Sequence, residues 1–124
     1  MRHDGQLVLD RMVKTARPGV FSAEDLEAYR ASWRQPGAVH SMVNWYRAAV
    51  RKLLSMGSVD PTIRPETLIV WGKQDDLLDW RMAEESARAC RAATLKWFEN
   101  GSHFVQHEEL DAVSRLLVEH VRIV

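Results

Sequence analysis

The chain has 124 residues, of which 46% are hydrophobic and 27% are charged, a composition typical of one small globular domain. Its 17 basic and 17 acidic residues balance, so charge gives no reason to expect nucleic acid or an anionic membrane as a partner. No apolar run approaches the roughly 20 residues that span a bilayer. The single cysteine, Cys90, excludes an intramolecular disulfide, and no Cys/His cluster has the spacing of zinc ligands. We therefore expect a cytoplasmic protein without a structural metal.

The first part of the chain predicts a helical domain over 1–56. Apolar residues recur at helical spacing in three segments, which are 7–14, 21–33 and 38–55. Ser22 is the expected N-cap of the second segment, with Asp25 three residues further on. Residues 57–66, "GSVDPTIRPE", contain two prolines and a glycine and therefore predict a linker.

The period changes after the linker, and residues 67–124 predict an α/β domain. The short apolar runs "TLIVW" (67–71) and "TLKWF" (94–98) are typical of buried parallel strands. Helical patterns follow each of them, at 79–93 with Asp79 as the expected N-cap and at 109–122. A strand–helix–strand–helix unit makes a right-handed crossover, so the two strands should run parallel and end at the same edge of the sheet.

Two polar side chains follow these strands. Asp75 lies four residues after the first strand, and His103 lies five residues after the second. Loops at the carboxyl edge of a parallel sheet are where α/β proteins place ligands, so we expect the two side chains to converge. A carboxylate beside a histidine orients the ring and stabilises the imidazolium, which serves covalent hydrolysis when a nucleophile is present. The alternative is that Asp75 and Asp76 cap the 79–93 helix or shape a turn, with His103 an ordinary loop residue.

The segments "TLIVWGKQDDLLD" and "GSHFVQHEELDAVSRLLVEHV" together resemble the C-terminal end of an α/β-hydrolase. Within that superfamily they are most similar to the epoxide hydrolase and haloalkane dehalogenase branch. The resemblance implies Asp75 as the triad acid, with its neighbour Asp76 as the rival, and His103 as the general base. It implies that His107 and Glu108 support the site or begin the last helix and are not catalytic. No metal or organic cofactor is implied.

The segment "FSAEDLEAYRASWRQPGAVHSMVNWYRA" resembles the later part of the helical cap of epoxide hydrolases. By that resemblance Tyr46, in "NWYR", would donate a hydrogen bond to the epoxide oxygen of a small apolar substrate. The alternative is a core residue, since Tyr46 lies on the apolar stripe of its helix.

The nucleophile of that family lies on an elbow of the type G-x-[DS]-x-G, and no glycine of this chain has a second glycine four residues on. We therefore expect a fragment that is inactive alone and that needs a complementing N-terminal portion or a homo-oligomer. The sequence leaves open whether the complete enzyme is an epoxide hydrolase, a haloalkane dehalogenase or a serine esterase, although "NWYR" favours an aspartate nucleophile. Two non-enzymatic alternatives remain, a non-catalytic remnant or subunit and an unrelated small α/β binding domain.

Overall fold

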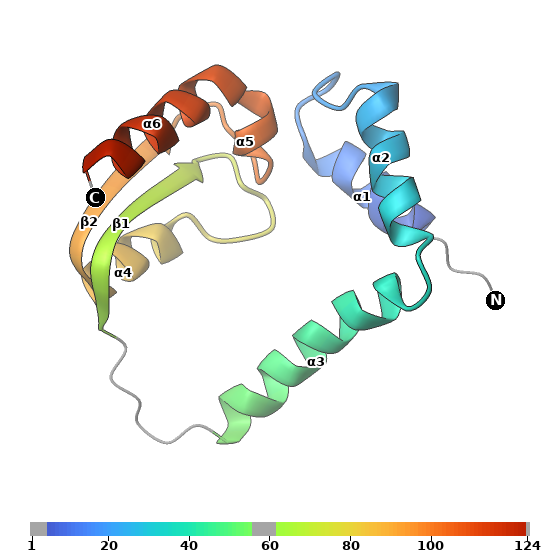
Figure 1. Cartoon of the computed structure of the whole chain (residues 1–124), viewed down its shortest axis with the longest axis horizontal. Coiled ribbons are helices and arrows are strands. Elements are labelled where there is room, and N and C mark those ends of the chain that lie inside the picture. Colours follow the sequence, from blue (N-terminus) through green and yellow to red (C-terminus); the bar gives the residue numbers. More distant parts are fainter. Residues whose placement is uncertain (1–4, 56–61, 124) are drawn as a thin grey trace. The chain divides into compact units, whose positions relative to one another are not determined.

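The structure is a computed structural model that describes residues 5–55 and 62–123 (Figure 1). The chain divides into two compact units, and we describe each by itself. Residues 5–14 and 21–55 belong to a helical unit, whereas residues 62–123 form an α/β unit. Residues 15–20 belong to the α/β unit, which differs from the predicted continuous helical domain over 1–56. The reason is a set of hydrogen bonds from Arg17 to residue 108, described below.

The helical unit contains α1 (Gln6–Thr15), α2 (Ala23–Trp33) and α3 (Ala38–Ser55). The N-cap prediction for α2 is confirmed, because the Ser22 hydroxyl accepts the Asp25 N–H at 3.1 Å and the Asp25 carboxylate accepts the Ser22 N–H at 2.8 Å. This reciprocal capping box satisfies two backbone donors at the helix start. The predicted bounds of α3 are also confirmed. No helix among the described residues is long and apolar enough to cross a membrane.

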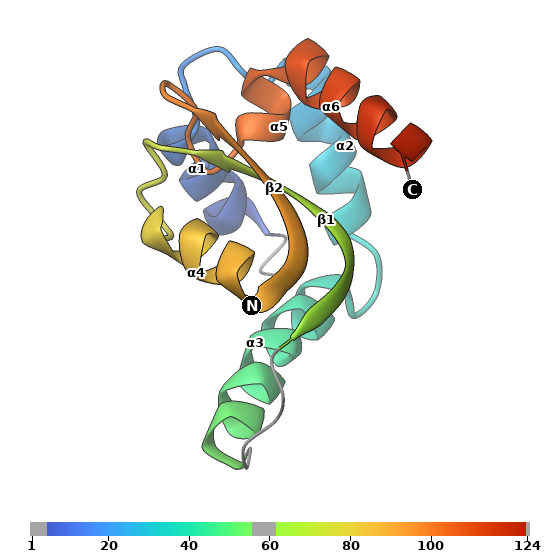
Figure 2. The ribbon, with the colours of Figure 1, turned by 90° about the vertical axis from the view of Figure 1, so that its left-hand side faces the viewer.

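The α/β unit contains a parallel pair of strands with helices on its two faces. Its elements are β1 (Ile63–Gly72), α4 (Arg81–Ala89), β2 (Cys90–Phe98), α5 (Val105–Glu108) and α6 (Leu110–Ile123). The two strands are hydrogen-bonded neighbours, with Gly72 opposite Phe98 at their carboxyl ends, so the predicted parallel pairing is confirmed. Figures 1 and 2 show α4 on one face of the pair and α6 on the other.

The strand β1 begins earlier than predicted. It starts at Ile63 and not at 67, so the predicted linker is wrong at 63–66, while residues 57–61 lie outside the described part of the chain. The pairing is irregular between Ile63 and Glu66. Pro65 lies in this stretch and has no N–H to donate, and proline is tolerated at such irregular or outer positions of a strand. Pro65 therefore marks an irregularity within the strand and not a linker before it.

The predicted helix over 79–93 is wrong at 90–93, where β2 has already begun at Cys90. Ala92 and Ala93 favour a helix by intrinsic propensity, but both pair with β1, and this non-local pairing decides their conformation. Asp79 is not the N-cap, because Trp80 occupies that position of α4, although its side chain makes no capping hydrogen bond. Asp79 nevertheless accepts the Arg81 N–H at 3.0 Å and so satisfies a donor of the first turn. The one-turn helix α5 was not predicted.

Candidate active site

The two loops that leave the carboxyl ends of β1 and β2 are bonded to each other through their backbones. The Lys73 N–H donates to the carbonyl of Phe98 at 3.0 Å, and the Gln74 N–H donates to the carbonyl of Gly101 at 2.9 Å. The hydrogen-bonding pattern of the parallel sheet thus continues past the last paired residues. It fixes the loop after β1, which carries Asp75, against the loop after β2, which carries His103.

Glycine at position 72 permits this close approach. A Cβ atom at Gly72 would lie 2.3 Å from the carbonyl oxygen of Gly101 and 2.4 Å from that of Ser102. Both contacts are with backbone, which cannot turn aside as a flexible side chain can. The "WG" pair at the end of β1 therefore has a steric function, because the absence of a side chain lets the two loops meet.

Asp75 and His103 form a hydrogen-bonded pair at the edge of the sheet. Nδ1 of His103 lies 2.9 Å from Oδ2 of Asp75. The other oxygen, Oδ1, accepts the backbone N–H groups of Leu77 at 2.8 Å and Leu78 at 3.0 Å. The Asp75 side chain is 6% exposed and the His103 side chain 32% exposed, so the carboxylate is buried while the ring still reaches solvent. The convergence expected from the sequence is found.

This geometry sets the roles of the ring nitrogens. A carboxylate can only accept hydrogen bonds, so the proton between the two groups belongs to Nδ1 of His103. Nε2 is then the nitrogen that can accept a proton, and the adjacent carboxylate stabilises the imidazolium that results. Asp75 also shapes its own turn, because it accepts the N–H groups of Leu77 and Leu78. It therefore has both the turn-forming role named above as the alternative and the contact with His103. Its rival Asp76 is exposed.

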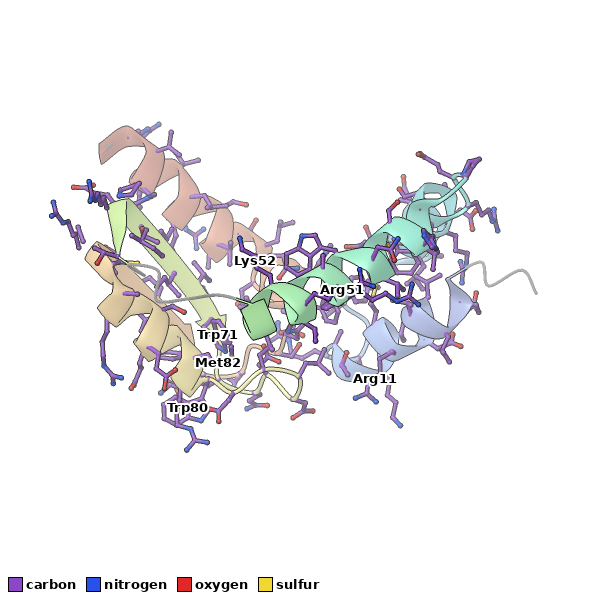
Figure 3. All side chains as sticks on the ribbon, turned by 90° about the horizontal axis from the view of Figure 1, so that it is seen from below. Arg11, Arg51, Lys52, Trp71, Trp80 and Met82 are labelled. Carbon is purple, nitrogen blue, oxygen red and sulfur yellow. The ribbon has the colours of Figure 1, made fainter. Side chains whose placement is uncertain are left out.

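A cavity of ≈ 170 Å³ opens beside the pair, lined by both loops and by the end of β1. Its lining includes Leu78, Val105 and Gln106 as well as the pair itself. Trp71 also lines it, and its indole N–H is buried and has no hydrogen-bond partner among the described residues. Figure 3 shows Trp71 on β1, with Trp80 and Met82 at the start of α4. The cavity thus combines a polar pair with mainly apolar walls.

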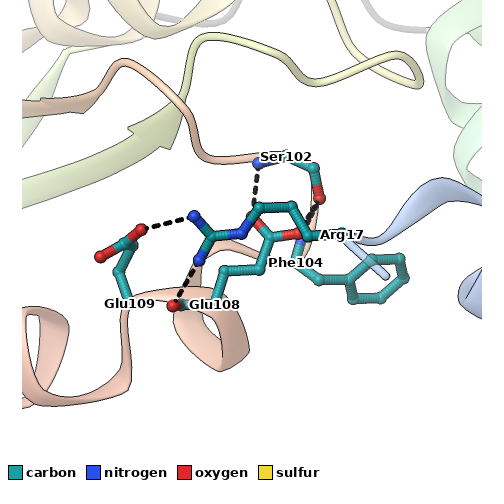
Figure 4. Close-up of polar contacts among 5 residues, drawn as sticks. All are labelled: Arg17, Ser102, Phe104, Glu108 and Glu109. Carbon is teal, nitrogen blue, oxygen red and sulfur yellow. Dashed lines mark hydrogen bonds and ion pairs between the residues drawn. The ribbon is translucent and has the colours of Figure 1, made fainter. Parts of the chain in front are cut away.

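Glu108 is a buried carboxylate that lies against the same loop. Its side chain is 0% exposed, and it accepts hydrogen bonds from Ser102 and Arg17 (Figure 4). Burial raises the pKa of Glu108, but the hydrogen bonds from the Ser102 side chain and backbone and from Arg17 outweigh it, and the net pKa is lowered. No local pattern could have identified Arg17 as a partner, because it lies 91 residues before Glu108.

The third predicted site residue, Tyr46, lies on α3 in the helical unit. Its side chain is 69% exposed, and its ring lies edge-on to Trp45 at 5.5 Å between centroids. Its predicted role toward a substrate stays a prediction, as does the alternative of a core residue. Among the described residues, no group of three or more His, Cys, Asp or Glu side chains gathers as a metal site would require.

Comparison with known proteins gives a consistent family. A family model described as the alpha/beta hydrolase fold matches residues 17–110. An "AB hydrolase superfamily protein" of Bacillus subtilis is 32% identical over 126 residues, which cover 98% of this chain and 42% of that relative. Epoxide hydrolase 2 of Caenorhabditis elegans is 30% identical over 125 residues, which cover 92% of this chain and 33% of that relative. A crystal structure of an epoxide hydrolase from Bacillus megaterium, bound to an inhibitor, matches with a TM-score of 0.72 at 23% identity, over 98% of this chain and 45% of that one. The chain therefore spans less than half the length of these relatives.

Proposed function

Because this chain belongs to the α/β-hydrolase fold family, we propose that it supplies the acid and the base of an epoxide hydrolase-like enzyme whose nucleophile comes from outside these 124 residues. The observation that carries the proposal is the Asp75–His103 hydrogen bond at the carboxyl edge of a parallel sheet. Several relatives of this chain are named epoxide hydrolases, which supports this reaction class.

In the proposed reaction an aspartate nucleophile opens the epoxide and forms an ester. His103 then takes a proton from water at Nε2, and the hydroxide so formed attacks the ester carbonyl and releases the diol. Asp75 keeps Nδ1 protonated and stabilises the imidazolium during the proton transfer. Tyr46 would donate a hydrogen bond to the epoxide oxygen as negative charge develops there, and the His103 imidazolium would return its proton to that oxygen as the diol leaves. The apolar walls of the cavity suit a small apolar substrate.

Two observations support the proposal that this chain is only part of the enzyme. The sequence holds no G-x-[DS]-x-G elbow, and only six described apolar residues are buried. Large apolar side chains are exposed instead, and Leu110, Leu117 and Val121 lie exposed along α6 at 62%, 51% and 70%. Such an exposed apolar surface is typical of an interface. A non-catalytic subunit is the second candidate function, favoured by the missing elbow.

A chimera tests the proposal. This chain would replace the matching portion of the Bacillus subtilis relative, whose own activity on an aryl epoxide is measured first. We expect the isolated chain to give no turnover above buffer and the folded chimera to hydrolyse the epoxide. His103→Gln in the chimera should lower kcat/KM by about 10²- to 10⁴-fold, the usual contribution of a general base. A folded chimera that is equally active with and without His103 would contradict the assignment, and a folded but inactive chimera would favour the non-catalytic subunit.

A further inference from the structure

The loop that carries His103 is held from below by one carboxylate. Oε2 of Glu108 accepts the backbone N–H of Ser102 at 2.6 Å, and Oε1 accepts the Ser102 hydroxyl at 2.5 Å. That hydroxyl in turn accepts the backbone N–H of Phe104 at 3.2 Å. The two residues on either side of His103 are therefore both tied to Glu108, one directly and one through the Ser102 hydroxyl.

Glu108 is itself held by a residue from a distant part of the sequence. The backbone N–H of Arg17 donates to Oε1 of Glu108 at 2.9 Å. The Arg17 guanidinium donates to the backbone carbonyl of Glu108 at 2.6 Å and pairs with the Glu109 carboxylate at 3.0 Å. Figure 4 shows this arrangement, in which Arg17 reaches the end of α5 while Glu108 reaches Ser102. We call these three residues, Arg17, Glu108 and Ser102, the Glu108 network.

The charge of Glu108 makes the network interdependent. A fully buried carboxylate is costly unless hydrogen bonds and an opposite charge compensate it. Here three donors surround the carboxylate, and Arg17 brings the positive charge, with its Nε 3.9 Å from Oε2. Replacing the Arg17 side chain would keep the backbone N–H at position 17 but would leave the buried charge without its cation. Replacing Glu108 would leave the Ser102 and Arg17 donors without their acceptor.

We propose that Glu108 and Arg17 are positioning residues, and that they hold the His103 loop in the one backbone conformation that places Nδ1 of His103 against Asp75. The inference rests on the proposed function only in taking His103 as the base. Ser102 is the link between the network and His103, and its buried hydroxyl donates to Glu108, so it is not available as a nucleophile. The segment 15–20 thereby acts on the His103 loop through Glu108 and Ser102.

The test uses the full chain labelled with ¹⁵N-histidine, because ¹⁵N shifts distinguish a ring protonated at Nδ1 from one protonated at Nε2. His103→Gln identifies the His103 signal among the five histidines. The wild-type ring should be protonated at Nδ1, as the Asp75 contact requires. In Arg17→Ala and in Glu108→Gln we expect a mixture of the two forms. Backbone hydrogen exchange of Ser102 and Phe104 should rise at least about tenfold, because Glu108→Gln removes one acceptor oxygen and Arg17→Ala leaves the buried carboxylate without its cation.

The matched control is Arg88→Ala, which breaks an exposed pair with Glu84 on α4 and should leave the ring and both amides unchanged. Variants that fold with the wild-type ring form and wild-type exchange would overturn the proposal. If either variant fails to fold, Ser102→Ala provides the test, because it leaves the Arg17–Glu108 contacts in place. An altered ring form of His103 and faster exchange of the Phe104 amide would support the proposal. Wild-type values of both would overturn it. None of these readouts uses turnover, so the network can fail while the chimera is active, and the chimera can fail while the network stands.

Discussion

Gly72→Ala should separate the acid loop from the base loop. The new Cβ would lie 2.3 Å from the Gly101 carbonyl oxygen, which is 1.1 Å closer than the 3.4 Å at which ordinary contact begins. The two backbones must move apart by about that distance, which breaks the bond from the Gln74 N–H to Gly101, now 2.9 Å, and strains the neighbouring bond to Phe98. Overpacking costs about 1–3 kcal/mol and the lost hydrogen bond about 0.5–1.5 kcal/mol, so we expect a loss of about 1.5–4.5 kcal/mol in the free energy of unfolding.

The assay is urea unfolding followed by far-UV circular dichroism, together with the ¹⁵N signal of His103. Lys73→Ala is the matched control at the next position of the same loop. It removes an exposed ion pair with Glu99 and should cost less than about 1 kcal/mol. If Gly72→Ala unfolded at the same urea concentration as Lys73→Ala and kept the His103 ring protonated at Nδ1, the close approach of the loops would not be what holds the pair together.

Two further predictions concern the carboxylates. Asp75→Asn places an amide that can donate a hydrogen bond opposite Nδ1, so His103 should change to the ring form protonated at Nε2, which ¹⁵N shifts would detect. The kcat/KM of the chimera should fall by about 10²- to 10⁴-fold. An unchanged ring form would refute the assigned contact. For Glu108 the folded-state pKa is lowered, so its ionised form stabilises the fold fully above the ordinary value of 4.5, and this contribution is lost as the pH falls through the lowered pKa. Glu108→Gln should therefore be less stable than wild type at pH 7, and its stability should fall less than that of wild type below pH 4.5. Urea midpoints measured across that pH range test this. Parallel pH curves for the two proteins would contradict the lowered pKa of Glu108.

The parts that could be predicted from the sequence are those set by local or topological rules. The capping box at Ser22 and Asp25 depends on two residues three apart, and α3 depends on one continuous amphipathic stripe. The meeting of Asp75 and His103 follows from a topological rule, since neighbouring parallel strands end at the same edge. Each prediction needed only nearby residues or the order of elements along the chain.

The parts that could not be predicted depend on partners far away in the sequence. Cys90 begins a strand because the residues after it pair with β1, a register that no local pattern contains. Glu108 ends a short helix and is buried against Arg17, at a separation of 91 residues. In both cases the local sequence was compatible with another structure, and a contact made elsewhere in the chain decided between them.

The Asp75–His103 pair and the Glu108 network depend on different parts of the chain. Asp75 and His103 come from one strand–helix–strand unit, 28 residues apart, and their loops are joined by backbone bonds that need nothing outside 62–123. Glu108 also lies in that stretch, but the charge that compensates its buried carboxylate does not, because Arg17 precedes α2. A chain that began after the linker would keep the pair and leave Glu108 buried without its cation. The α/β unit that holds His103 in place therefore begins at residues 15–20, and the helical segment between them and β1 is an insertion into it.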